Sequence, residues 1–188
     1  MKRFGPKDEC YAVLYNAKDA PYIEKLTMKD PNYLYSTFQE KYNDHLGLSE
    51  FIAIAKADDI VTFPGLSYCM QLILGSQTVR FNFMCAGSSG TIADPFKQTL
   101  YSEAASRINM TTSGTIARLT GPDAMQYIGN FPASFQTITV KESCINTTSV
   151  PNTGILLNRN MFSSSDIVHV SGGTAFTLGS RISFVGLP

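Results

Sequence analysis

The stretch Thr174-Ala-Phe-Thr-Leu-Gly-Ser-Arg-Ile-Ser-Phe184, near the end of the 188-residue chain, decides the fold. Large apolar side chains recur at even positions along it, at Phe176, Leu178, Ile182 and Phe184. Alternation with a period of two is typical of a β-strand that places one face on a core and the other towards water. We therefore expect a strand here that closes a β-rich body.

Two further runs upstream have strand character. Residues 135–142 alternate between apolar and polar side chains, and residues 154–162 form an apolar-rich run after a polar loop. Clusters of Ser, Thr, Asn, Pro and Gly separate the runs, and these residues favour turns. The pattern predicts a mainly β chain, which we expect to form an antiparallel β-sandwich or jelly-roll-like body with a partly helical N-terminal segment.

The composition of the chain changes near residue 60. Residues 1–60 carry 18 of the charged side chains and 4 Ser or Thr, whereas residues 61–188 carry 12 charged side chains and 31 Ser or Thr. We therefore expect two parts: a charged, Tyr-rich arm with a short helix at 1–60, and the β body at 61–188.

The first of these parts is rich in tyrosine, a residue that suits contact surfaces because it combines an apolar ring with a polar tip. One interpretation is an arm that reaches a neighbouring subunit; the other is a flap or short helices folded on the chain's own body. The candidate interface residues are Tyr11, Tyr15, Tyr22, Tyr33, Tyr35 and Tyr42.

The middle of the chain mixes helical and strand signals. Residues 48–58 are predicted to be a helix capped by Ser49, and residues 64–75 a second helix stopped by Gly75, with a buried strand as the alternative. Further predictions are a strand at 78–86, a turn at 87–91, a short helix or turn at 94–107, a strand or hairpin broken at Gly114 within 108–120, and a loop or helical turn at 121–130. Within the predicted helix or turn, Glu103 and Arg107 have the i,i+4 spacing of a helical ion pair, which we expect to be solvated.

The sequence contains no signature of catalysis, and we expect no catalytic residue, cofactor or metal site. Neither histidine stands in a motif, and His169 alternates with valines, which indicates the polar face of a strand. The four cysteines, Cys10, Cys69, Cys85 and Cys144, lack metal-ligand spacing, and we interpret them as buried free thiols, with a disulfide as the alternative.

Overall charge also limits the classes of partner. The formal net charge is zero at pH 7, which gives no electrostatic case for binding nucleic acid, and no apolar run is long enough to span a membrane. Only 16% of the residues are charged, against about 25% in an average domain. The low charge indicates a surface that other protein covers.

Three pieces occur in an order found in one family. The first is Arg80-Phe-Asn-Phe-Met-Cys-Ala-Gly-Ser-Ser-Gly90, a strand that runs into a glycine turn. The second is Asp94 followed by the Leu-x-x-Glu-x-x-x-Arg motif of residues 100–107. The third is a terminal block that contains Ile138-Thr-Val-Lys-Glu142 and Gly154-Ile-Leu-Leu-Asn-Arg159-Asn-Met-Phe162. In this order the pieces resemble small β-sandwich structural proteins of tailed viruses of bacteria and archaea, such as head-decoration, neck or tail components.

The resemblance covers about residues 79–184 and implies a function. It implies a non-enzymatic virion component, made in the host cytoplasm, that contacts its own copies and other virion proteins. It also implies an ion pair between Glu142 and Arg159 across adjacent strands. One departure is Ser143-Cys144-Ile145, where the family has Gly and a large apolar residue. The alternative is a carbohydrate- or receptor-binding module, for which Tyr101, Tyr127 and Phe131 are the available aromatic residues.

Overall fold

The structure of the protein is a computed structural model that describes residues 6–29, 53–92, 94–119, 124–133, 137–163 and 168–184. Within these residues, two α-helices, α1 (Ala20–Lys29) and α3 (Phe63–Ile73), and one short 3-10 helix (Ala17–Asp19) accompany the strands. The strands are β1 (Pro6–Asn16), β2 (Ala53–Val61), β3 (Phe83–Gly87), β4 (Ile108–Asn109), β5 (Gly114–Leu119), β6 (Ala124–Phe131), β7 (Ile138–Val140), β8 (Glu142–Asn146), β9 (Leu156–Phe162), β10 (Val168–Val170) and β11 (Thr174–Phe184).

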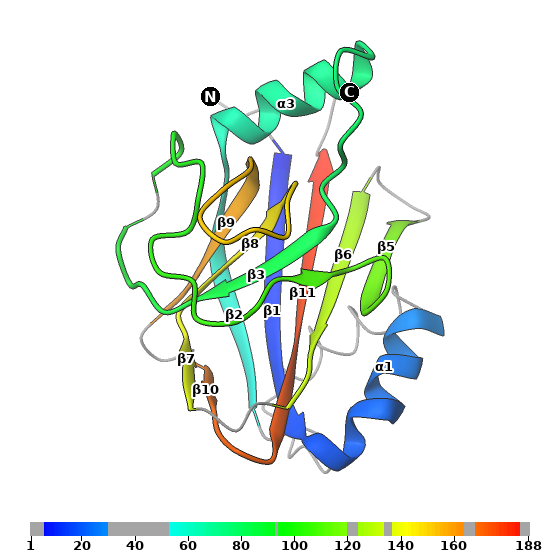
Figure 1. The fold of residues 1–188 in the computed structure, drawn as a ribbon, viewed down its shortest axis with the longest axis vertical. Helices are drawn as coiled ribbons and strands as arrows, with labels where there is room; N and C mark the ends of the chain where they lie inside the picture. Colours follow the sequence, from blue (N-terminus) through cyan, green and yellow to red (C-terminus); the bar gives the residue numbers. More distant parts are fainter. Residues whose placement is uncertain are drawn as a thin grey trace.

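Nine of the strands form one sheet in the order β4-β3-β8-β9-β2-β1-β11-β6-β5, and all its pairings are antiparallel (Figure 1). A second, two-stranded sheet pairs β10 with β7. The longest pairing joins β1 to β11 along their whole lengths, from Pro6 opposite Phe184 to Asn16 opposite Thr174. The prediction of a mainly β, antiparallel fold is confirmed.

The nine-stranded sheet curls into a nearly closed, barrel-like arrangement. Its two edge strands, β4 and β5, are joined by residues 110–113 alone, so the chain itself brings the edges together. Asn130 at the end of β6 donates its backbone N–H to Ser113 in this connection at 3.0 Å. Across the interior, a Cβ added at Gly129 would lie 2.7 Å from the Met84 Cβ, so β3 and β6 meet where a glycine leaves room. The sheet is continuous, and a two-sheet sandwich or jelly roll is not specifically confirmed.

The interior of the barrel holds the main apolar core and a small polar network. Phe131 and Phe176 stack with ring centroids 4.4 Å apart. Asn158 on β9 donates to Ser180 Oγ on β11 at 3.0 Å, and the adjacent Asn160 donates to Ser143 Oγ on β8 at 3.2 Å. Because buried amides are costly unless they are hydrogen-bonded, these bonds fix β9 against strands on both sides of the interior.

The first strand occupies the middle of the sheet, where β2 and β11 flank it. Tyr11 and Tyr15 on β1 are fully buried against the outer face of the sheet, in a cluster with Ile23 of α1. The change of composition near residue 60 is therefore not a structural boundary, because β1 and β2 belong to the same sheet as β9 and β11. The prediction of a separate N-terminal arm is wrong for β1 and β2.

Several local predictions were right. Residues 63–73 are helical, with Thr62 as the N-cap and Gly75 at φ +72° just beyond the end. Strands β9 and β11 match the predicted runs, and His169 is exposed on β10. The run at 108–120 is interrupted as predicted, but at residues 110–113, and Gly114 begins β5. The predicted strand at 78–86 is present only from Phe83, and the run at 135–142 divides between β7 and β8.

Other local predictions were wrong. The described part of the predicted helix 48–58 belongs to strand β2, where Ala55 and Ala57 point into the core and both neighbouring strands supply hydrogen bonds. The predicted loop at 121–130 is largely strand β6. Residues 94–107 contain no helix among those described. The second face of β11, expected to be exposed to water, is also covered at its start, since Ala175 and Thr177 are as buried as Phe176.

Candidate functional site

Residues 88–92 and 94–107, here called the cover segment, lie over the outer face of β3, β8 and β9. Leu100 of this segment is buried in a small cluster with Cys85, Cys144 and Leu156. The backbone N–H of Ser88 donates to Ser102 O at 2.8 Å, so the segment returns on itself beside β3. Two buried ion pairs hold the cover segment in place.

The first ion pair joins Glu142 of β8 to Arg159 of β9, and both side chains are fully buried. Arg159 Nε donates to Glu142 Oε2 at 2.6 Å, and its Nη2 donates to Thr91 O at 2.8 Å. The other carboxylate oxygen, Glu142 Oε1, accepts the backbone N–H of Ser102 at 3.1 Å. The pair that the resemblance implied is therefore present, and each partner also binds the backbone of the cover segment.

Tyr101 lies over this pair at the surface. Its ring packs against two cations, with the Arg159 guanidinium carbon 4.7 Å and the Lys97 Nζ 4.3 Å from the ring centroid. Contacts of this kind between a cation and a ring face are favourable, more so when one cation is desolvated. Tyr101 remains 39% exposed and is the one aromatic of the three proposed for a binding module that is accessible, because Tyr127 and Phe131 are buried.

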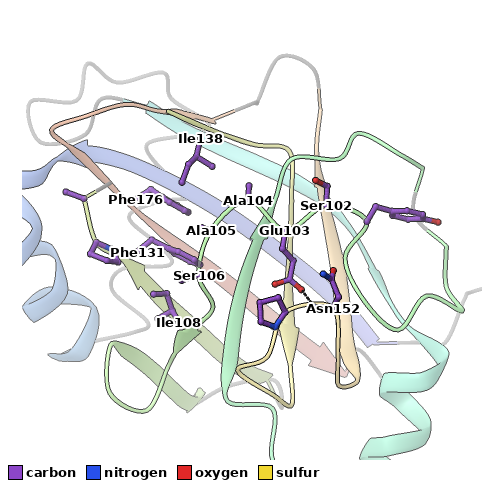
Figure 2. Close-up of a pocket in the computed structure, with 14 residues that line it drawn as sticks. Ser102, Glu103, Ala104, Ala105, Ser106, Ile108, Phe131, Ile138, Asn152 and Phe176 are labelled. Atoms are coloured by element: carbon purple, nitrogen blue, oxygen red, sulfur yellow. Dashed lines mark hydrogen bonds between the residues drawn. The ribbon is translucent and has the colours of Figure 1, made fainter. Parts of the chain in front are cut away.

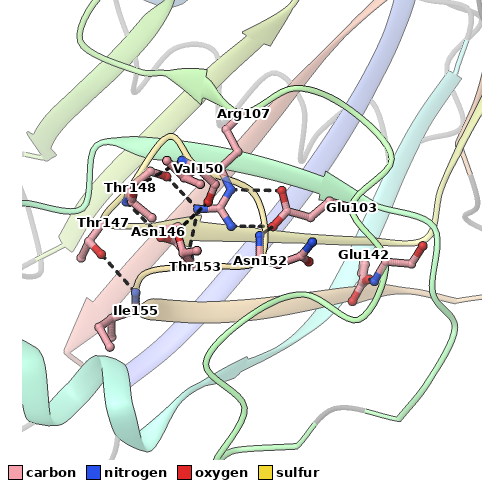
Figure 3. Close-up of polar contacts among 11 residues, drawn as sticks. Glu103, Arg107, Glu142, Asn146, Thr147, Thr148, Val150, Asn152, Thr153 and Ile155 are labelled. Carbon is pink, nitrogen blue, oxygen red and sulfur yellow. Dashed lines mark hydrogen bonds and ion pairs between the residues drawn. The ribbon is translucent and has the colours of Figure 1, made fainter.

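The second ion pair joins Glu103 to Arg107 and is shown in Figure 3. Arg107 Nε donates to Glu103 Oε2 at 3.1 Å, and its Nη2 binds the other carboxylate oxygen. Arg107 Nη1 also donates to the carbonyls of Thr148 and Thr153 at 2.7 and 3.1 Å, and the Asn152 N–H donates to Glu103 at 3.0 Å. The pair therefore fixes the connection between β8 and β9.

The setting of this pair differs from the predicted one. Residues 103 and 107 do not lie on a helix, and their side chains are almost completely buried instead of solvated. Burial alone would raise the pKa of Glu103, but the hydrogen bonds from Arg107 and from the Asn152 backbone outweigh it and lower that pKa. The pKa of Arg107 is raised in turn, because the Glu103 carboxylate outweighs the effect of burial. Both groups are thus held in their charged forms.

The four cysteines are free thiols, as predicted. Cys85 and Cys144 stand directly opposite each other on β3 and β8, beneath the cover segment. Burial, with the neighbouring Cys85 thiol, raises the pKa of Cys144 well above its ordinary value. A thiol with a raised pKa is a poor nucleophile, so Cys144 has the character of a core-packing residue.

A groove of about 900 Å³ opens beside the cover segment. Figure 2 shows the residues that line it. Its base includes Phe131, Phe176 and Ile138, and its rim includes Ser102, Ser106 and Asn152. Glu103 also lines the groove, but both of its carboxylate oxygens are already hydrogen-bonded. The groove is thus apolar at its base, with small polar groups around its mouth.

Helix α3 lies across one end of the barrel (Figure 1). Its outer side is apolar and exposed. Its inner side packs Tyr68, Cys69 and Leu72 against the core, yet Gly65 is its only buried residue. The exposed apolar residues, here called the α3 face, are Phe63, Met70, Ile73, Leu74 and, from the cover segment, Phe96. Phe96 joins this surface because its ring lies 5.0 Å from that of Phe63.

The α3 face was not predicted from the sequence, although the absence of charged residues in this part of the chain pointed to it. Residues 60–79 contain no Asp, Glu, Lys or Arg. A helix without charged side chains has little surface suited to water and is expected to be largely buried. Of the predicted tyrosine interface, Tyr22 on α1 is 54% exposed, Tyr11 and Tyr15 are buried within the chain, and Tyr33, Tyr35 and Tyr42 lie outside the described residues.

The chain matches no protein-family model, no curated protein and no solved structure. Within the described ranges, no group of three or more His, Cys, Asp or Glu side chains could hold a metal ion. In that same part of the chain, no helix has the length and apolarity needed to cross a bilayer.

Proposed function

We propose that the protein is a non-catalytic structural subunit of a larger protein assembly. The observation that carries this proposal is the α3 face, a group of large apolar side chains, each more than half exposed, on and beside a helix with no charged residue. Contiguous exposed apolar surface marks a site of interaction with protein or lipid. The low overall charge supports the same conclusion.

The buried charged side chains in and beneath the cover segment also favour a structural role. Glu142 and Arg159 are fully buried, and Glu103 and Arg107 nearly so; their hydrogen-bonding groups are bound to one another and to backbone groups. A general acid or base must be within reach of a substrate proton. These four groups instead fix the outer layer of the barrel and make it a rigid support.

We further propose that the assembly is a virus particle, on the strength of the resemblance across residues 79–184. The test is to purify particles from the source culture on a density gradient and quantify the chain by mass spectrometry. We expect it to band with the particles, in a fixed ratio to their major protein, after a high-salt wash. The amount of an abundant host protein in the same fraction measures contamination of the particles by host material. A chain that stays in the unbanded fraction, or falls to the level of the host protein, would contradict the proposal.

The groove favours a second candidate, a binding module for carbohydrate or a cell-surface receptor. Its volume lies within the range of ligand sites, and exposed Tyr101 stands at its edge as a surface on which a sugar ring could stack. A glycan array tests this candidate, with Tyr101→Ala expected to abolish any signal and Tyr22→Ala, on α1, to retain it. An array with no signal for the wild-type chain would exclude the glycans it displays.

A further inference from the structure

We propose that the α3 face binds the α3 face of a second copy of this chain, with the two helices antiparallel across a two-fold axis. This inference rests on the proposed structural role, because it names the partner of that surface. The exposed fractions are 54% for Phe63, 57% for Met70, 78% for Ile73, 76% for Leu74 and 70% for Phe96. Side chains of this size and composition at such exposure form an interface when they are contiguous.

The α3 face is held rigidly by the barrel. Thr62 caps the helix by accepting the Gly65 N–H at 3.0 Å and donates its own hydroxyl to Leu156 O of β9 at 2.6 Å. A Cβ added at Gly65 would lie 2.4 Å from that same carbonyl, so the helix backbone touches the strand. A surface that is already in place loses little conformational entropy on binding, which favours association.

The charge of the α3 face selects the kind of partner. No charged residue occurs from 60 to 79, and the two charged residues nearest to Phe96 in the sequence, Asp94 and Lys97, already have partners within the cover segment. Asp94 accepts the Phe96 N–H at 2.9 Å, and Lys97 lies over the Tyr101 ring. A charged partner surface would be desolvated here without compensation. The partner surface must therefore be apolar and neutral, and a second α3 face meets both conditions.

A membrane surface fits less well than a second copy. Helices that lie in the lipid interface carry Lys and Arg along their polar side, where these residues attract anionic headgroups. Helix α3 has no basic residue, and its polar side chains are Ser67, Tyr68 and Gln71. An amphipathic helix is held on a bilayer by an apolar side and by basic residues on its polar side, and α3 lacks the basic residues.

The area of the α3 face is sufficient for a dimer. At these exposures, five residues of this size present roughly 600 Å² per copy, so their complete burial in a pair would remove about 1,200 Å², at the lower end of specific interfaces. In an interface with two-fold symmetry the same surface faces itself. An antiparallel arrangement places Phe63 of one copy near Leu74 of the other and brings the two Met70 side chains close to the axis.

The mass of the full-length chain, measured by light scattering across a range of concentrations, tests this proposal. We expect the wild type to have twice the chain mass and Met70→Glu to have the mass of one chain. Tyr22→Glu is the matched control: it places the same charge on an equally exposed apolar residue of α1, and should remain dimeric. Circular dichroism checks that each variant is folded.

Cross-linking distinguishes this mode of pairing from others. In a Cys69→Ser background, Met70→Cys should give a covalent dimer with a short bifunctional maleimide, and Tyr22→Cys should not. A wild type that is monomeric at the highest concentration, a folded Met70→Glu that remains dimeric, or a monomer that binds neutral lipid vesicles through Met70 would each overturn self-pairing. Recovery of the chain in purified particles would then leave the proposed structural role standing with a different partner.

Discussion

Four charged side chains are buried between the cover segment and the sheet, and each ion pair joins parts of the chain that are distant in sequence. The Glu142–Arg159 pair connects β8 and β9 to the backbone of Thr91 and Ser102. The Glu103–Arg107 pair connects the cover segment to the turn between β8 and β9. Because a buried charge that loses its partner is costly, these residues set the arrangement of the outer layer.

The Glu142–Arg159 pair provides the first prediction. Arg159→Met should leave the fully buried Glu142 carboxylate without its partner and lower the free energy of unfolding by about 3–5 kcal/mol. The double variant Glu142→Leu with Arg159→Met removes both charges, so its free energy of unfolding should fall less than that of Arg159→Met alone. Urea unfolding followed by circular dichroism measures both. If Arg159→Met melted like the wild type, the pair would have no structural role.

The second prediction concerns acid. The pKa of Glu103 is lowered in the folded protein, so its ion pair stabilises the fold fully above the ordinary glutamate pKa of about 4.3. That contribution is lost as the pH falls through the lower, folded pKa. Unfolding free energies should therefore fall between about pH 5 and pH 3 more steeply for the wild type than for Glu103→Gln. Equal slopes for the two proteins would show that Glu103 does not contribute.

At the scale of elements, prediction from sequence succeeded where one local signal dominated. Strand β11 has a strict period of two, and α3 has a cap at Thr62 and a stop at Gly75. Strand β1 could not be predicted this way, because Tyr11 and Val13 on one face are as buried as Ala12 and Leu14 on the other. A strand covered on both faces shows no alternation.

The other features that sequence analysis did not predict depend on contacts between residues that are distant in sequence. The Ala-rich run of β2 has the composition of a helix, but its hydrogen bonds come from β1 and β9, which are distant in sequence. The ion pairs could be proposed from spacing and resemblance, yet their burial depends on a cover segment without regular structure. The α3 face was missed because a charge-free helix predicts burial, and the side of the helix that remains open depends on the whole fold.

Contact between α3 and β9 provides the third prediction. Gly65→Ala places a methyl group 2.4 Å from a backbone carbonyl that cannot move away freely, so the helix must shift outward. We expect a loss of roughly 1–3 kcal/mol in unfolding free energy, although alanine is the better helix former. Gly90→Ala is the control, because the nearest atom to its added Cβ is 4.0 Å away. Thermal melts of both variants decide whether the close approach matters.

The whole molecule depends on a closed path of strands in which the first strand is central. The order β2-β1-β11-β6 places the strand from the start of the chain beside β11, the strand at its other end, as well as beside β2. The barrel can therefore close only after both ends of the chain are available. Contacts of such long sequence separation are typical of slowly folding β proteins.

The last prediction follows from this topology and concerns removal of the N-terminal strand β1. A chain that starts at Ala17 lacks β1, which exposes the hydrogen-bonding edges of β2 and β11 and removes Tyr11, Tyr15 and the core side chain Leu14. We expect that chain to be unfolded or aggregated by circular dichroism and light scattering, because unpaired strand edges promote association. A chain that starts at Pro6 retains all of β1 and serves as the control. If the chain from Ala17 folded with the strand content and melting temperature of the control, residues 6–16 would be a dispensable arm, and the central place of β1 would be refuted.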